Sequence, residues 1–156
     1  MHAIESWASL YANHAALKTA VQFLHVGGLL AGGGCAIAAD RTTLLVFRMQ
    51  AAARALQLGF LKTTHRVVVG GLACTIASGL LLLGADLDTF LYSKVFWLKM
   101  GLLALLLANG AVLLAAERRV ERGDESGWAR LRGSSVASLV LWFATTCAGV
   151  GITNIG

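Results

Sequence analysis

Four long apolar runs constrain this chain more than any other feature of its sequence. Each run is close to the roughly 20 residues that a helix needs to cross the hydrocarbon core of a bilayer. The composition agrees, because 57% of the residues are hydrophobic, 13% are charged and none is proline. The runs lack the alternation of polar and apolar residues typical of membrane strands, and an unpaired strand could not satisfy its backbone in lipid. The predicted spans lie at about residues 18–39, 63–84, 92–116 and 133–153.

The sequence therefore predicts an all-α integral membrane protein, an antiparallel four-helix bundle that forms a single transmembrane domain over residues 1–156. Before the first span, Ile4, Trp7, Tyr11 and His14 recur at helical spacing, which favours an N-terminal amphipathic helix at the membrane interface. Between the first two spans, apolar residues are interleaved with arginines. This pattern favours either a second amphipathic helix or helical extensions of both spans.

Lysine and arginine are distributed unevenly between the two ends of the predicted bundle. Ten of them flank or occupy the connections after the first and third spans, whereas only Lys18, Lys94 and Lys99 lie toward the other end. Short loops rich in these residues stay in the cytoplasm. We therefore expect a bacterial inner-membrane protein with both termini in the periplasm. The net charge of +5 follows from this topology, and it gives no reason to expect nucleic acid as a partner.

Residues suited to hold a cofactor share one depth in the outer half of the predicted bundle. At about 1.5 Å per residue, His25 lies on the order of 10 Å from the outer surface, and Lys99 and Met100 lie at roughly 12–14 Å. Cys147 returns to a similar level on the fourth span. We take His25, Met100 and Lys99 as candidate cofactor-binding residues, and His25, Met100 and Cys147 as candidate metal ligands.

A second polar layer is predicted near the inner face, where His65, Asp40 and Asn109 approach the same depth. Interfacial salt bridges and side chains that reach toward the headgroups are one interpretation of this layer. His65 is the weaker candidate for binding a cofactor. It also lies roughly 15 Å from His25 in depth, too far for both histidines to ligate one haem iron within a protomer.

Three roles stay open for His25. Haem iron takes axial histidine with histidine or methionine, so His25 would act with Met100 or with the same histidine of a second copy. Copper(I) prefers thiolate and thioether ligands with imidazole, a set that His25, Met100 and Cys147 could supply. In a structural role, His25 would form a hydrogen bond to a neighbouring helix, while Gly28 and Gly32 allow close helix packing.

Motifs of nucleotide binding or hydrolytic chemistry are missing from the sequence, and so are paired carboxylates within the predicted spans. The three cysteines lie at different depths, so we expect no structural disulfide. Lys99 either extends outward past Phe96 toward Asp86 or Asp88, or has an anionic partner such as a haem propionate, a quinone or lipid headgroup, or a bound anion. We expect no independent catalytic activity.

Three segments carry a resemblance to known families: the first span with His25, Gly28, Gly34 and Asp40, the stretch SGLLLLGAD, and the stretch VFWLKMGLLALLLANGAVL. Together they resemble a group of small bacterial four-span inner-membrane proteins. The third span is also similar to the membrane domain of copper-resistance D type proteins, and the whole plan is similar to four-helix b-type membrane cytochromes. The cytochrome resemblance implies haem held between helices by histidine, and the copper resemblance implies metal movement through the bundle.

The leading hypothesis is a haem-associated membrane protein or an electron-transfer subunit of a larger redox complex, with haem b as the cofactor. A copper-handling or transport-related protein is the first alternative. The second is a structural accessory subunit that binds no cofactor. In each case the partners expected are the lipid bilayer and either further copies of the chain or a larger membrane complex.

Overall fold

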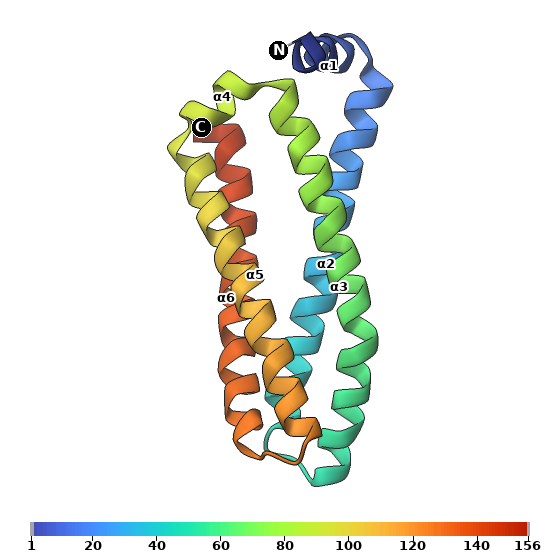
Figure 1. Cartoon of the computed structure of the whole chain (residues 1–156), viewed down its shortest axis with the longest axis vertical. Helices are drawn as coiled ribbons and strands as arrows, with labels where there is room; N and C mark the ends of the chain where they lie inside the picture. Colours follow the sequence, from blue (N-terminus) through green and yellow to red (C-terminus); the bar gives the residue numbers. More distant parts are fainter. Residues whose placement is uncertain (1, 156) are drawn as a thin grey trace.

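The computed structural model describes residues 2–155, with side chains described as far as residue 152. These residues form six α-helices: α1 (His2–Asn13), α2 (Ala15–Val46), α3 (Ala51–Ala85), α4 (Leu87–Tyr92), α5 (Lys94–Glu121) and α6 (Ser126–Ile155) (Figure 1). Helices α2, α3, α5 and α6 are long and apolar enough to cross a membrane. The structure thus confirms the predicted all-α bundle of four spans with a short N-terminal helix.

The four long helices are arranged as two antiparallel pairs. Helix α2 packs along α3 and α5 packs along α6, while α2 and α6 form the contact between the pairs. Figure 1 shows the pairs lying together at the end that carries the short connections and separating toward the end where α1 and α4 lie. We call these the connection end and the terminal end. Because α2 and α6 are the elements in contact, α3 and α5 flank the seam between the pairs.

At the connection end, the long helices extend beyond the predicted spans. Residues 47–50 alone separate α2 from α3, so the arginine-containing segment between the first two spans consists of helical extensions, one of the two predicted alternatives. Residues 122–125 separate α5 from α6, and Gly123 adopts a φ of 82° where the chain reverses. Glycine reaches this left-handed conformation at little steric cost, which ends α5 sharply.

Polar side chains cap the helices that follow a turn. Asp86 accepts a hydrogen bond from the Thr89 backbone N–H at the start of α4, and Ser93 accepts one from Phe96 at the start of α5. Asp124 accepts a hydrogen bond from the backbone N–H of Ser126. Hydrogen bonds from the side chain and then the backbone of Ser126 lower the pKa of Asp124. Each cap satisfies a backbone donor that the helix itself leaves free.

Helix α1 lies across the terminal end of the α2–α3 pair, held by a tryptophan (Figure 1). Trp7 donates a 2.8 Å hydrogen bond from its indole Nε1 to the backbone oxygen of Leu81. The indole also lies against Gly84, where a Cβ would approach Trp7 Cδ1 to 3.4 Å. Amphipathic rings of this kind favour the membrane–water interface. The predicted N-terminal helix is therefore present, and it is docked on α3.

Glycines bring α2 and α3 into backbone contact. A Cβ added at Gly71 would lie 2.6 Å from the backbone nitrogen of Gly32 and 2.7 Å from the backbone oxygen of Gly28. Apolar burial gives no driving force between helices in lipid, so such close packing is a principal source of association. The contact confirms the predicted packing role of Gly28 and Gly32.

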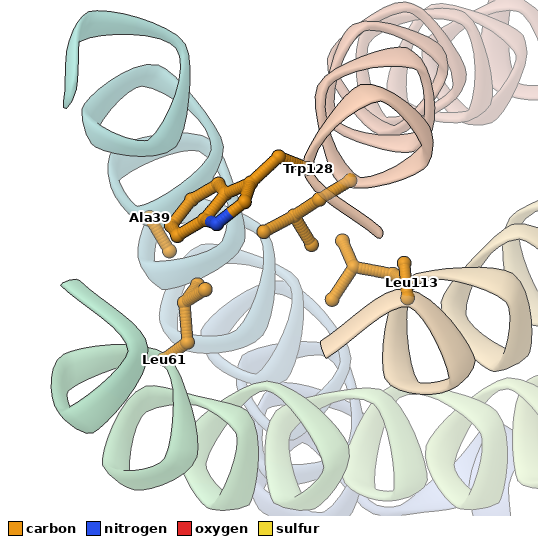
Figure 2. Packing of buried hydrophobic residues seen from close by; sticks show 6 residues of the cluster. Ala39, Leu61, Leu113 and Trp128 are labelled. Carbon is orange, nitrogen blue, oxygen red and sulfur yellow. The ribbon is translucent and has the colours of Figure 1, made fainter. Parts of the chain in front are cut away.

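A cluster of buried apolar residues joins the two pairs near the connection end. Figure 2 shows the Trp128 ring reaching from α6 toward Ala39 of α2, with Leu61 of α3 and Leu113 of α5 beside it. Trp128 is 5% exposed and Leu131 is fully buried. All four spans contribute to this cluster, so it fixes their relative positions at this end.

The α2–α3 contact predicts unequal effects for two adjacent glycines. We expect Gly71→Ala to destabilise the bundle by about 1–3 kcal/mol, because the added methyl group meets backbone atoms that cannot move aside easily. Gly70→Ala is the matched control, since nothing lies within 4 Å of a Cβ there. Unfolding in mixed micelles, followed by circular dichroism, measures both free energies. Equal stabilities of the two variants would contradict this account of the contact.

Candidate functional site

His25 lies half-buried on α2, with its imidazole directed at α3. Its Nδ1 is 3.2 Å from the hydroxyl oxygen of Ser78. A Cβ at Gly79 would come within 3.2 Å of His25 Cε1, so the missing side chain leaves room for the ring. The structure thus places His25 at the α2–α3 contact, on the terminal-end side of the glycines.

The hydrogen bonds of Ser78 determine which nitrogen of the neutral His25 ring carries the proton. The Ser78 hydroxyl lies 2.7 Å from the backbone oxygen of Cys74 and 3.1 Å from that of Thr75, and both oxygens only accept. Its single proton is therefore directed at these carbonyls. This arrangement favours a hydrogen bond that runs from Nδ1–H of His25 to the Ser78 oxygen. Neutral His25 is left with an unprotonated Nε2, whose lone pair is available to a ligand.

Lys99 faces the same region from α5. Its charge acts electrostatically on His25, and its Nζ lies 3.4 Å from the position that a Cβ of Gly149 would occupy. The absence of a side chain at Gly149 therefore leaves space for the ammonium beside α6. Among the described residues no carboxylate forms a salt bridge with Lys99, so Asp86 and Asp88 do not neutralise it. Such an uncompensated charge in a span is costly.

The other two members of the predicted outer layer lie apart from this pair. Met100 is half-buried on α5, and Cys147 is exposed on α6. Within the described part of the chain, no hydrogen bond or ionic interaction connects either residue to His25 or Lys99. The same residues contain no group of three or more His, Cys, Asp or Glu side chains arranged to hold a metal ion. The structure thus brings together His25 and Lys99.

A cavity of about 290 Å³ lies nearer the connection end, between the two helix pairs. Its floor includes Asp40 and Ala36 of α2 with Ser138 and Trp142 of α6, all of them buried. Exposed apolar residues of α3 and α5 form its rim; these are Val69, Leu107 and Ala111. Because the rim side chains belong to the lipid-facing surface, the cavity opens toward the membrane between α3 and α5.

The predicted inner layer is present, and it lines this cavity. Asp40, His65 and Asn109 all contribute to the lining. Asn109 is occupied, since its amide donates a 3.0 Å hydrogen bond to the Ser134 backbone oxygen and its Oδ1 accepts one from the Ser134 hydroxyl. Asp40 forms no salt bridge among the described residues. The interpretation of this layer as interfacial salt bridges is therefore wrong for Asp40.

Two buried carboxylates, one on α2 and one on α5, lie just beyond the ends of the predicted spans. Asp40 is 3% exposed and lies against Ser138 and Ser135 of α6. Glu117 of α5 is 6% exposed, acts electrostatically on Asp40, and has a buried Oε1 without a hydrogen-bond partner in the described structure. Lys62 also acts on Glu117, but its ammonium is paired with Glu121 at 2.8 Å.

Sequence reasoning placed Asp40 in the inner layer but missed Glu117, because the third predicted span stops at residue 116, one residue before this carboxylate. A helical stripe offered a signal. Glu117 continues the spacing of Leu106, Gly110 and Leu113 on one face of α5, and Asp40 follows Ala36 at a spacing of four on α2. Continuing these faces by one residue would have marked both carboxylates as interior.

The two polar regions are separate sites. Ser78, which binds His25, and His65, which lines the cavity, are 13 residues apart on α3. This spacing corresponds to about 20 Å along the helix axis. His25 and His65 therefore cannot be axial ligands of one iron in a single protomer.

Comparisons with models of protein families, with curated proteins and with solved structures found no match to this chain. The four long apolar helices support a four-span membrane protein. The structure thus agrees with the general four-span plan and identifies no particular family.

The hydrogen-bond geometry at His25 predicts a change of tautomer in Ser78→Ala. Loss of the Ser78 oxygen removes the acceptor that holds the proton on Nδ1, so we expect the Nε2–H form to increase at His25. Nitrogen-15 NMR of histidine-labelled protein in micelles measures the two forms. Ser138→Ala, at the cavity, serves as the control and leaves the His25 signals unchanged. A wild-type spectrum with Nε2 protonated in the neutral ring would contradict this assignment.

Proposed function

We propose that the protein binds haem b in the outer half of the bundle through His25 and acts as a small electron-transfer subunit of a membrane redox complex. The observation that supports this proposal is the contact between His25 Nδ1 and the Ser78 hydroxyl, which favours a tautomer with an unprotonated Nε2. Histidines that ligate metals commonly donate their other ring N–H to a fixed acceptor, which sets the tautomer and the ring orientation. Haem bound there would supply one-electron transfer.

Lys99 gives the proposed site a cationic side. Its ammonium has no salt bridge among the described residues, and it acts on His25 from the opposite helix pair. A propionate is a suitable counterion for such a charge within a span. Met100, the residue after Lys99, is the candidate for a second axial ligand, and the same histidine of a second copy is the alternative.

The proposed setting is a bacterial inner membrane with the terminal end in the periplasm. The terminal end carries α1 and α4 (Figure 1). Ten of the 13 lysines and arginines lie toward the connection end, which favours a cytoplasmic location for that end. The periplasmic half would then contain His25 and Lys99.

The haem proposal is tested by absorption spectroscopy of protein purified in mild detergent from cells supplied with haem precursor. We expect a Soret band that shifts on reduction with dithionite. His25→Ala should lose at least nine-tenths of this band, because the axial nitrogen is removed, whereas His65→Ala should retain it. Protein that remains colourless, or His25→Ala protein that keeps its haem, would refute the proposal.

The orientation predicts where reporters fused to each end of the bundle become active. We expect alkaline phosphatase, which folds only in the periplasm, to be active after residue 156 and inactive when inserted in the turn at residues 122–125. A green fluorescent protein at the same two positions gives the reverse pattern. Phosphatase activity at the turn would show that the connection end faces the periplasm.

A further inference from the structure

We propose that the cavity between α3 and α5 binds a cationic amphiphile, an amine on a compact apolar body, with its ammonium at Asp40 and its body between the rim helices. This site is distinct from the one proposed for haem, since His65 in its lining lies about 20 Å along α3 from the residue that binds His25. The proposal depends on three features: the shape and lining of the cavity, its charge, and its unpartnered polar groups.

The lining suits an apolar body that arrives through the membrane. Leucines and valines of α3 and α5 form the walls, and the side chain of Trp142 closes the floor. Small-molecule sites are typically concave and largely apolar, with a small number of polar groups that fix the orientation of the ligand. The exposed rim residues Val69 and Leu107 place the mouth on the lipid-facing surface, so a ligand dissolved in the bilayer has direct access.

Charge selects a cation over an anion or a neutral molecule. Asp40 is 97% buried at the floor of the cavity, and Glu117 of α5 acts on it from nearby. The lysine closest to these groups, Lys62 of α3, is exposed and paired with Glu121. From α6, Asp40 meets the neutral hydroxyls of Ser138 and Ser135. A buried carboxylate without a cation is costly in a membrane, and an ammonium ligand would remove that cost.

Unpartnered polar side chains add hydrogen-bonding capacity beside Asp40. Thr64 is 8% exposed and lines the cavity, and no hydrogen bond to its hydroxyl occurs among the described residues. The neighbouring His65 ring also lines the cavity without a hydrogen-bond partner in this part of the chain. An ammonium has several protons to donate, so the Asp40 carboxylate and the Thr64 hydroxyl could accept from the same ligand.

The test compares two ligands of the same shape, 1-aminoadamantane and 1-adamantanol, which differ in charge. Isothermal titration calorimetry is carried out on the full-length protein in maltoside micelles at pH 8, where the amine is protonated. We expect saturable binding of the amine and at least tenfold weaker binding of the alcohol. Asp40→Asn should abolish this preference. Asp86→Asn, which replaces an exposed carboxylate at the start of α4, is the matched control and should retain it.

A second variant keeps the test decisive if Asp40→Asn fails to fold. Gly110 lines the cavity and has nothing within 4 Å of a Cβ, so a leucine there starts in open space and adds volume at the cavity. We expect normal folding and at least tenfold weaker binding of the amine. Gly101→Leu, also in open surroundings on α5 but outside the lining, should bind as the wild type does.

Three results would overturn the proposal. The first is the absence of saturable amine binding to the wild-type protein. The second is equal binding of the amine and the alcohol, which would identify the cavity as a site for neutral apolar molecules such as lipid chains. The third is unchanged amine binding in folded Asp40→Asn or in Gly110→Leu.

Discussion

The backbone contact between α2 and α3 determines where the polar side chains of this bundle meet. Gly71 lies against Gly28 and Gly32 so closely that a methyl group has no room, and the register of the two helices follows from this fit. His25 and Ser78 lie one to two turns from the contact, and their hydrogen bond requires that register. In lipid, where apolar burial adds little to helix association, packing of this kind takes the place of a hydrophobic core.

Two polar sites result from the way in which the helix pairs are joined. Near the connection end, Trp128 and its neighbours hold all four spans together, and the Asp40 cavity lies next to that cluster. Toward the terminal end the pairs separate (Figure 1), and Lys99 of α5 acts electrostatically on His25 of α2. One site therefore combines an imidazole with a cation, whereas the other combines carboxylates with hydroxyls. Their chemistry differs enough that they would select different ligands.

Hydropathy predicted the spans, the helical spacing of residues 4–14 predicted the N-terminal helix, and glycine spacing predicted the packing of Gly28. The helical rise predicted similar heights for His25 and Lys99, and in the structure Lys99 acts electrostatically on His25. Rotation about each helix axis was not predictable, since apolar residues surround every span. Cys147 shares the predicted depth but is exposed on α6, and the pairing of Asp40 with Glu117 depends on the convergence of helix ends, which no single span encodes.

The seam flanked by α3 and α5 gives the molecule a mechanical asymmetry. The members of each pair pack against each other, while the two pairs are joined through α2 and α6 from the tryptophan cluster at Trp128 up to Trp142, which lies against Gly33. A relative tilt of the two pairs would therefore turn about this joined region. Because displacement grows with distance from that region, a small tilt would change the separation of His25 and Lys99 more than it would change the tryptophan cluster. Because the cavity mouth lies between α3 and α5, the same tilt would also change its width.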